Sequence, residues 1–369
     1  MPRISNTAVL RAYKQHPLLP LLLRECRSHD SAKIELRWLH ERANYLVSSK
    51  KDARSAYSPF GWRRLLRSMC HARSKGVPLQ YILGDQPFGD LEILCEKGVL
   101  IPRAETEAFT IHTANLILDN IRGHERRVGG QQARCLRIVD ICTGSGCIAL
   151  LLHALLASYI DRLSILGLDI SPMAIGLAKK NLKHNIQLGL LSNRAATEVT
   201  FRRGNVLAHS GGKVPVVKEV LRDFQRLPFD AEPHCDVLIS NPPYISPESF
   251  WDGTTSRSVR IFEPKLALVP PLGVADVVLG IDKPEDLFYY HIIQLSFTIQ
   301  AKLVVLECGS RSQAARVAAI GKNLCNEHRP NVSIKIWPDT GALTGDDICS
   351  EDEPCVVVLQ TRLENALGT

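Results

Sequence analysis

The sequence predicts a doubly wound α/β domain that follows a smaller helical domain. From residue 136 onward, short β-rich runs alternate with helical runs, which is typical of α/β proteins. Strand runs such as residues 138–141 and 304–306 are apolar on both faces, as a parallel sheet covered by helices on both sides requires. In residues 18–73, by contrast, apolar side chains recur every three or four positions, which predicts helices. The 369 residues are enough for two domains, each with its own core.

Composition excludes several classes of protein. With 45% apolar and 22% charged residues, the chain is neither a disordered tail nor a collagen or a disulfide knot. Its 11 cysteines are scattered and form no C-x-x-C pair, so we expect neither a disulfide framework nor a metal site. No apolar run reaches the roughly 18 to 20 residues of a membrane-spanning helix, so we expect a soluble protein. The net charge of +7 suits an acidic partner or merely solubility, and does not decide between them.

The N-terminus is basic and has two interpretations. Its first acid is Glu25, and Ser5, Thr7 and several leucines stand among the basic residues before it. Such a composition suits a mitochondrial presequence within residues 1–16. It equally suits a basic first helix of the folded domain. The basic residues are Arg3, Arg11, Lys14 and Arg24.

Three parts follow one another along the chain. We expect a helical domain over residues 1–75, and a joint over 76–104, where the runs 77–84 and 88–94 resemble a short hairpin bounded by glycine and proline. The α/β domain then covers residues 105–369. Segment 209–233 does not fit the alternation of strands and helices, so we interpret it as a surface insertion.

Seven strands and five helices are expected in the α/β domain. The strands are residues 136–142, 163–170, 199–205, 236–240, 302–308, 332–337 and 354–360. The helices are residues 105–121, 148–159, 172–185, 284–299 and 313–325.

A glycine turn follows the first of these strands. Gly144 and Gly146 lack a Cβ, so the backbone here can approach a bound nucleotide or amino acid closely. The N–H groups at the start of the next helix favour an anionic group such as a carboxylate. A tight turn between strand and helix, without any ligand, would have the same sequence.

An acid stands at the tip of the next strand. Asp169 could hold the hydroxyls of a ribose there, or it could simply cap a helix together with Ser171 and Pro172. Ala149 stands where a dinucleotide fingerprint would have its third glycine or alanine. The loop alone therefore does not exclude a nicotinamide enzyme.

The strand at 236–240 ends in Asn241, Pro242, Pro243 and Tyr244. Such strand ends hold active sites in open α/β folds. The two prolines make the segment rigid, and it presents carbonyl oxygens and the Asn241 amide oxygen as acceptors for an NH₂ group. The Tyr244 ring offers a flat face on which a planar nitrogen group can stack. A proline-rich turn is the alternative, and it explains the whole strand-and-motif context poorly.

These motifs together resemble the class I S-adenosylmethionine-dependent methyltransferases, and among them the HemK/PrmC-type release factor glutamine N5-methyltransferases. The resemblance covers nearly the whole chain. Asn-Pro-Pro-Tyr alone is also similar to a motif of DNA adenine and some rRNA amino-methyltransferases, whereas the segment at 101–107 and the helical N-terminal domain favour a protein substrate. The resemblance rests on five further motifs. They are YILG (81–84), IPRAETE (101–107), DICTGSG (140–146), FEPKLAL (262–268), and ECG (307–309) followed by Gln313.

The resemblance implies a class I methyltransferase sheet of seven strands and a site for S-adenosyl-L-methionine. Its methionine part would be wrapped by Cys142, Thr143, Gly144, Ser145 and Gly146. Asp169 would bind its ribose, Asn205 and Val206 would lie near its adenine, and Asn241 would also contact it.

The chain departs from the family pattern at two positions. The family commonly has Asp in place of Asn205, although an amide can still accept from the adenine amino group. Ala104 replaces a proline, which loosens the local backbone. Arg103, Glu105 and Glu107 are retained, and they either brace the site or form an ordinary ion-pair cluster.

The function that the resemblance implies is N5-methylation of the glutamine in the Gly-Gly-Gln motif of a peptide-chain release factor. The helical domain would recognise this partner, and the basic leader indicates a mitochondrial rather than a cytoplasmic location. We expect a monomer. Two alternatives remain: an amino-methyltransferase acting on adenine or guanine of nucleic acid, although no basic cluster with aromatics accompanies the motif, and a non-catalytic protein that binds a translation factor. The sequence does not indicate which release factor is methylated, whether an activating partner is needed, where a leader is cleaved, or what segment 339–353 does.

Overall fold

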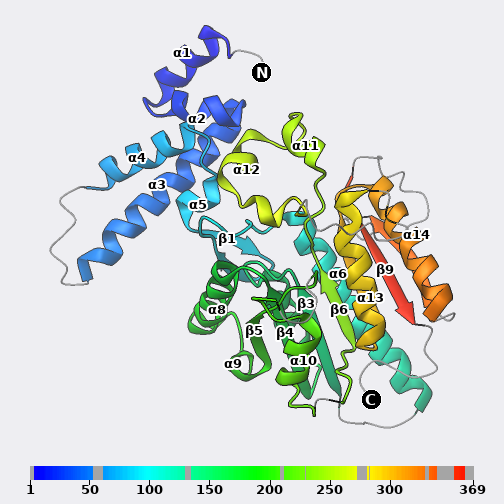
Figure 1. Cartoon of the computed structure of the whole chain (residues 1–369). Coiled ribbons are helices and arrows are strands. Elements are labelled where there is room, and N and C mark those ends of the chain that lie inside the picture. The colour runs from blue at the N-terminus through cyan, green and yellow to red at the C-terminus, as the bar shows by residue number, and fades with distance from the viewer. Residues whose placement is uncertain are drawn as a thin grey trace. The chain divides into compact units, whose positions relative to one another are not determined.

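The computed structural model of the chain consists of two compact units (Figure 1). It describes residues 4–52, 61–128, 134–207, 212–228, 230–271, 281, 283–328, 332–338 and 353–361. Segment 339–353 therefore lies outside the described residues except for Glu353. Unit 1 comprises Met1–Gln86, Cys95–Lys97 and Thr255–Glu263, and unit 2 comprises Pro87–Leu94, Gly98–Thr254 and Pro264–Thr369.

Unit 1 is helical. The basic leader forms the first helix, whose start is capped by the Ser5 hydroxyl accepting from the Ala8 N–H, and whose Ala12 is fully buried in the core of the unit. The chain thus folds here as a first helix of the domain would. The helices are α1 (Asn6–Gln15), α2 (Leu19–Cys26), α3 (His29–Asp52), α4 (Trp62–Ser74), α5 (Leu79–Leu83) and α12 (Arg257–Phe262).

Helix α12 joins unit 1 from far along the chain. The Ser258 hydroxyl donates to the carbonyl of Gly76 at 2.6 Å, across 182 positions of sequence. The motif at residues 262–268 is thereby divided, since Glu263 belongs to unit 1 and Pro264 to unit 2. We identified no sequence pattern for this return.

The hairpin expected in the joint is shorter than predicted. Residues 79–83 form helix α5, and Gly84 ends it in the left-handed conformation, with φ of +96°. Pro78 and Gly84 therefore flank a helix rather than a hairpin. The interpretation of run 77–84 as part of a hairpin was wrong. The two-stranded sheet contains only β1 (Asp85–Phe88) and β2 (Leu91–Leu94).

Unit 2 is built on a seven-stranded sheet, as predicted. The strand order is β5-β4-β3-β6-β7-β9-β8. Strands β5, β4, β3, β6 and β7 are parallel, whereas β9 runs antiparallel to both β7 and β8. The bounds are β3 (Cys135–Ile141), β4 (Arg162–Asp169), β5 (Val199–Arg203), β6 (Val237–Ser240), β7 (Leu303–Cys308), β8 (Val332–Pro338) and β9 (Cys355–Thr361).

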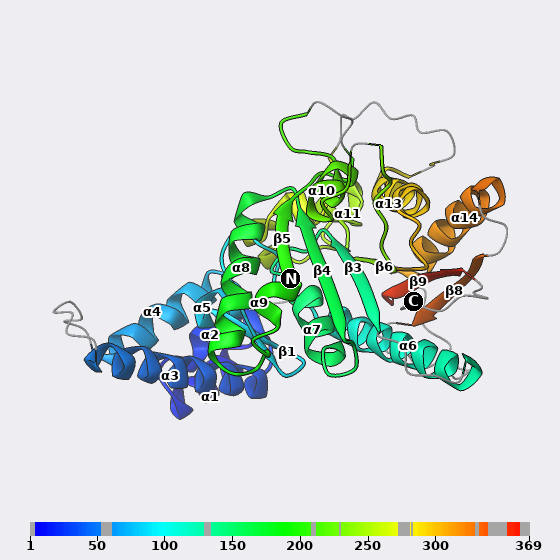
Figure 2. The ribbon, with the colours of Figure 1, turned by 90° about the horizontal axis from the view of Figure 1, so that it is seen from below.

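Helices cover both faces of this sheet, which confirms the doubly wound architecture (Figure 2). Alternate strand residues enter opposite cores: Ile138 packs on one side and Val139 on the other. The first face carries α6 (Ala104–Val128), α7 (Cys147–Leu156) and α8 (Pro172–Gln187). The second carries α10 (Val217–Phe224), α13 (Leu287–Thr298) and α14 (Arg311–His328). Short elements complete the unit: α9 (Ala195–Glu198), α11 (Pro247–Trp251), and the 3₁₀ turns η1 (Lys265–Ala267) and η2 (Pro284–Asp286).

Segment 209–233 is not simply a surface insertion. Its central part is α10, which buries Val217, Val220 and Leu221 in the core of the second face. The glycines and the proline before α10 are typical of a loop, and α10 itself has only eight residues. The sequence pattern therefore did not reveal a helix that covers the sheet. Residues 208–211 and 229 lie outside the described part of the chain.

The strand order reverses beside β3. From β3 the chain continues to β4 and β5 on one side, and then returns to place β6 on the other. Ile141 at the end of β3 is paired with Ser240 at the end of β6. The loops that follow these two strands therefore leave the sheet side by side, at the switch point where open α/β sheets bind ligands.

Candidate active site

A cavity of about 230 Å³ lies at the carboxyl ends of these strands, within unit 2. One water needs only about 10–15 Å³, so the space suits an organic ligand. Nine of the predicted site residues line it: Cys142, Thr143, Gly144, Ser145, Asp169, Asn205, Val206, Asn241 and Pro243. Three do not: Gly146, Pro242 and Tyr244.

The two glycines after β3 serve different purposes. A Cβ on Gly146, whose φ is +83°, would stand 2.8 Å from the Phe201 ring and 3.0 Å from the Ala178 Cβ. This glycine therefore permits packing of the fold. A Cβ on Gly144, whose φ is +54°, would meet only the Cys142 carbonyl at 3.9 Å. The space at Gly144 is open, and Gly144 lines the cavity.

The loop is tied to a buried carboxyl group at the end of β3. The Thr143 hydroxyl donates to Asp140 Oδ2 at 2.5 Å, and the Thr143 N–H donates to the Leu168 carbonyl at 2.9 Å. Asp140 is fully buried, and burial raises its pKa to about 7, against the opposing effect of the Thr143 hydrogen bond. These bonds fix the loop between two neighbouring strands.

Asp169 fastens the tip of β4 to the same loop. Its Oδ2 accepts from the Gly144 N–H at 3.0 Å and its Oδ1 from the Ser171 N–H at 2.8 Å. Burial raises the pKa of Asp169, although both hydrogen bonds act in the opposite direction. The cap of α8 is Ser171, whose hydroxyl accepts from Ala174, so helix capping does not account for Asp169.

Asn205 and Val206 follow β5 at the far wall of the cavity. The Asn205 side-chain oxygen accepts from the Leu207 N–H at 3.0 Å, which stabilises the turn. Among the described residues, no other hydrogen bond to this side chain is found, so one lone pair of the oxygen and the NH₂ group remain for a ligand. The surrounding cavity wall is apolar, with Leu207, Val217 and Phe288.

Asn241 after β6 belongs to a chain of polar groups. Its Nδ2 donates to the Thr106 hydroxyl at 3.0 Å, and that hydroxyl donates to Glu307 Oε2 at 2.7 Å. The Tyr244 hydroxyl donates to the other oxygen, Glu307 Oε1, at 3.3 Å. Each carboxylate oxygen of Glu307 therefore accepts one hydrogen bond.

Glu307 is the buried anchor of this chain. Its side chain is 2% exposed, and the Tyr289 hydroxyl donates to its backbone carbonyl at 2.8 Å. Burial raises the pKa of Glu307 to about 7, while the bonds from Thr106 and Tyr244 lower it. Burial and the nearby Glu307 also raise the pKa of Tyr244 well above its ordinary value.

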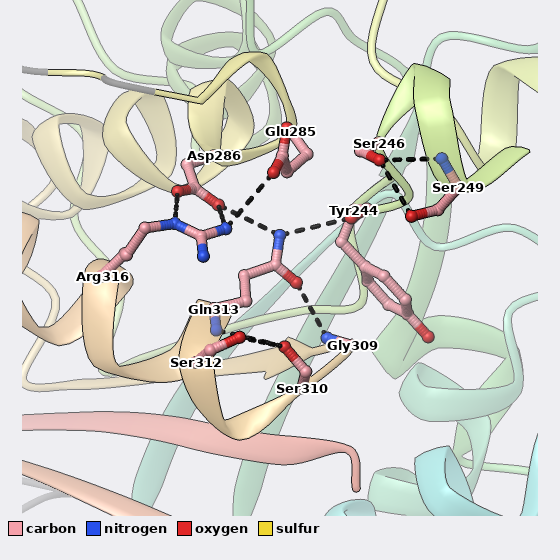
Figure 3. A network of polar contacts seen from close by, with 10 residues as sticks. All are labelled: Tyr244, Ser246, Ser249, Glu285, Asp286, Gly309, Ser310, Ser312, Gln313 and Arg316. Atoms are coloured by element: carbon pink, nitrogen blue, oxygen red, sulfur yellow. Dashed lines mark hydrogen bonds and ion pairs between the residues drawn. The ribbon is translucent and has the colours of Figure 1, made fainter. Parts of the chain in front are cut away.

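Tyr244 is held from the side of α13 and α14 (Figure 3). Gln313 Nε2 donates to the Tyr244 carbonyl at 3.3 Å and to Asp286 Oδ1 at 3.1 Å, and Gln313 Oε1 accepts from the Gly309 N–H at 2.9 Å. Arg316 in turn forms an ion pair with Asp286. The cluster clamps the end of the Asn-Pro-Pro-Tyr segment against the turn after β7.

The ring of Tyr244 packs closely on Gly309. A Cβ at Gly309 would lie 2.7 Å from the ring, so no larger residue fits there without movement. Because the cavity does not reach Tyr244, stacking of a substrate on this ring stays a prediction.

Sequence reasoning did not assign roles to Thr106 and Glu307. Both lie in motifs on which the family resemblance rests, but their contact joins residues 201 positions apart. Of the neighbouring charged residues, Arg103 lines the cavity, whereas Glu105 and Glu107 do not. In the described part of the chain, no cluster of three or more His, Cys, Asp or Glu side chains is arranged to hold a metal ion. The described helices include none that is both long and apolar enough to cross a membrane.

Known proteins resemble this chain in sequence over most of its length. The mitochondrial MRF1 N(5)-glutamine methyltransferase MTQ1 of Saccharomyces cerevisiae is 35% identical over 300 residues, covering 79% of this chain and 76% of the relative. The probable MRF1 mitochondrial N(5)-glutamine methyltransferase of Schizosaccharomyces pombe is 31% identical, covering 87% and 89%. A release factor glutamine methyltransferase of Chlorobaculum tepidum is 32% identical over 207 residues, covering 56% and 58%. No protein-family model matches the chain.

Solved structures give weaker similarities. The catalytic domain of human METTL16 in complex with an RNA hairpin covers 86% of this chain and 99% of that one, at 16% identity and a TM-score of 0.45. These values carry no argument, and the fold rests on the strand order of the chain itself. The sequence relatives are decisive because two of them exceed 30% identity over at least three quarters of their own length. The chain therefore belongs to the release factor glutamine methyltransferase family.

Proposed function

We propose that this chain transfers a methyl group from S-adenosylmethionine to the side-chain nitrogen, N5, of the glutamine in the Gly-Gly-Gln motif of a mitochondrial peptide-chain release factor. One observation carries the proposal beyond family membership. Among the described residues, the Asn241 side-chain oxygen accepts no hydrogen bond, while its NH₂ group is committed to Thr106 at the wall of the cavity. An amide NH₂ is what such an acceptor binds.

The cavity suits the proposed cofactor. The open space at Gly144 leaves room for the methionine part of S-adenosylmethionine. The N–H groups at the start of α7 favour the carboxylate of this methionine part. The Asp169 oxygens accept from the Gly144 and Ser171 N–H groups, and a carboxylate has further lone pairs for ribose hydroxyls. The apolar wall beside Val206 and Phe288 can enclose adenine.

Residues of this chain would orient the acceptor. Bound in the cavity, S-adenosylmethionine supplies an electrophilic methyl group on its sulfonium. The Asn241 oxygen and the Pro242 carbonyl would each accept one N–H of the glutamine amide, directing its nitrogen at the methyl group. They would also stabilise the positive charge that grows on this nitrogen. Orientation of this kind supplies about 7–11 kcal/mol in favourable reactions.

No general base is required in this scheme. Glu307 is 2% exposed and does not line the cavity, and its oxygens accept from Thr106 and Tyr244, so it holds the site rather than takes the proton. The proton leaves to the acceptors or to water after the methyl group has moved. Catalysis then depends on position and on fixed dipoles.

The names of the fungal relatives support a mitochondrial location, and the name of the Chlorobaculum tepidum relative supports a release factor as partner. The helical unit 1 would recognise the factor, and the α/β unit 2 would hold the cofactor. We expect the enzyme to act as a monomer. Finding the native protein wholly in cytosolic fractions would remove the mitochondrial part of the proposal.

Tandem mass spectrometry tests the function directly. The purified protein and S-adenosylmethionine are incubated with a mitochondrial release factor, and the Gly-Gly-Gln peptide is then sequenced. We expect one added methyl group on the glutamine side chain, absent with Asn241→Ala and retained with Asn193→Ala, a matched change at an exposed residue. An unmodified glutamine, with a folded factor and demonstrated cofactor binding, would overturn the proposal.

A further inference from the structure

Thr106 and Glu307 form a buried hydrogen-bonded pair behind Asn241. They are 3% and 2% exposed, and they come from the first turn of α6 and the end of β7. Their contact of 2.7 Å continues into the 3.0 Å contact between Thr106 and Asn241. The pair thus lies directly behind the proposed acceptor of the substrate amide.

The direction of these hydrogen bonds follows from chemistry. Above its pKa of about 7, Glu307 is a carboxylate with no proton to give, so the single hydroxyl proton of Thr106 is donated to Glu307. The Thr106 oxygen is then an acceptor toward Asn241, and only the NH₂ end of the Asn241 amide can face it. The oxygen of that amide must therefore lie on the opposite side.

We infer that Thr106 and Glu307 are positioning residues, which fix the orientation of the Asn241 amide so that its oxygen is presented to the substrate glutamine. This inference rests on the proposed function and deepens it. The oxygen and the NH₂ group of a side-chain amide have similar shapes. Packing alone therefore barely distinguishes the two orientations of an Asn side chain. A directional chain of hydrogen bonds does distinguish them.

The opposite orientation would be unproductive. If the Asn241 amide were turned over, its NH₂ group would face the NH₂ group of the substrate, placing donor against donor. The site would lose the hydrogen bond that orients the nitrogen and that strengthens as positive charge develops there. Methyl transfer would slow, while contacts to the cofactor and to the rest of the factor would persist.

Two substitutions at Thr106 separate this role from packing. Thr106→Val keeps the shape and removes the hydroxyl group, whereas Thr106→Ser keeps the hydroxyl group. Thr110→Val is a matched control, because Thr110 is fully buried on the same helix and donates only to the Thr106 carbonyl of that helix. Assays at pH 8 keep Glu307 largely ionised, since its pKa is about 7.

We expect Thr106→Val to lower kcat by about 10- to 100-fold, with the KM for the release factor changed by no more than about twofold. Thr106→Ser should restore most of the turnover, and Thr110→Val should retain it. Thermal unfolding and binding of S-adenosylhomocysteine confirm that each variant folds. Wild-type turnover in folded Thr106→Val, or an equal loss in Thr106→Ser, would overturn the inference.

A spectroscopic measurement tests the orientation without turnover. The side-chain amide of Asn241 is assigned in a ¹H–¹⁵N spectrum by its loss in Asn241→Ala. Its protons should exchange slowly with solvent in the wild type and in Thr106→Ser, and faster in Thr106→Val. Identical exchange in all three would overturn the inference. If the spectra follow this expectation but the wild type methylates no release factor, the proposed function fails and the positioning role stands.

Discussion

The two halves of the site are built in different ways. The cofactor cradle, which is the loop 142–146 with Asp169, is held by hydrogen bonds between residues 2, 3, 25 and 36 positions apart. The acceptor clamp, which is the Asn-Pro-Pro-Tyr segment with Thr106, Glu307 and Gln313, is held by bonds that span 63 to 201 positions. The bonds of the cradle join segments at most 36 positions apart, whereas those of the clamp join segments up to 201 positions apart.

The halves also differ in what their residues contribute. The cradle depends on absent side chains at Gly144 and Gly146, which leave room for a ligand or for neighbouring strands. The clamp depends on directed polar groups around a buried carboxyl group. Damage to the cradle should therefore impair binding or folding, and damage to the clamp should impair turnover.

The largest expected effect is that of Asn241→Ala on turnover. Loss of a group that binds the developing charge costs about 10²–10³-fold in kcat in comparable sites. Binding of S-adenosylhomocysteine by calorimetry should remain within about fivefold of the wild type, since most of the cavity is unchanged. Equal losses in S-adenosylhomocysteine binding and in kcat would contradict separate roles for the cradle and the clamp.

The buried carboxyl group of the clamp should make stability depend on pH. Burial raises the pKa of Glu307 from 4.5 to about 7, so the folded state holds a proton that the unfolded state releases between these values. The free energy of unfolding of the wild type should therefore fall, relative to Glu307→Gln, as the pH rises from about 4.5 to about 7, by on the order of 3 kcal/mol. Above pH 7 the difference should level off.

Urea denaturation of both proteins at several pH values checks this dependence. The Glu307→Gln variant is the reference for the wild type, because Asp140 and all other titrating groups are common to both proteins. A difference between the two that stays constant from pH 5 to pH 8 would contradict a proton held by Glu307.

In the cradle, Gly146→Ala should destabilise the fold. Its φ of +83° disfavours alanine by about 1–2 kcal/mol, and the contact of 2.8 Å with Phe201 adds strain from overpacking, for a total of roughly 2–3 kcal/mol. Gly176→Ala is the control, since Gly176 lies in α8 with no atom within 4 Å of an added Cβ. Thermal melting should separate them, and equal melting temperatures would show that Gly146 has no packing role.

Gly144→Ala should have the smallest effect on stability and a selective effect on binding. Alanine at φ of +54° costs about 1 kcal/mol, and among the described residues the nearest atom to the added Cβ is the Cys142 carbonyl oxygen at 3.9 Å. The methyl group would occupy cavity space, so the Kd for S-adenosylhomocysteine should rise by about 10-fold. Unchanged affinity would place the ligand elsewhere.

The sequence predicted the cradle better than the clamp. Long apolar strands such as β3 and β7 were located within one residue, because their hydrophobic runs identify them without tertiary context. The loop after β3 and Asp169 were likewise found, since short-range chemistry defines them. Nine of the predicted site residues line one cavity.

The sequence did not predict what depends on distant partners. Helix α5 was interpreted as part of a hairpin, and α10 as an insertion, because their apolar residues become meaningful only against the cores that they enter. The return of α12 to unit 1 leaves no periodic pattern in six residues. Thr106 and Glu307 gained a role only when folding brought them together behind Asn241.

Single-turnover methylation of the release factor at saturating S-adenosylmethionine, with Gly144→Ala and Asn241→Ala measured side by side, tests the division most directly. The account predicts that Gly144→Ala approaches the wild-type rate once the cofactor is saturating, while Asn241→Ala remains slower by about 10²-fold or more. Recovery of Asn241→Ala at high cofactor concentration, or failure of Gly144→Ala to recover, would contradict it.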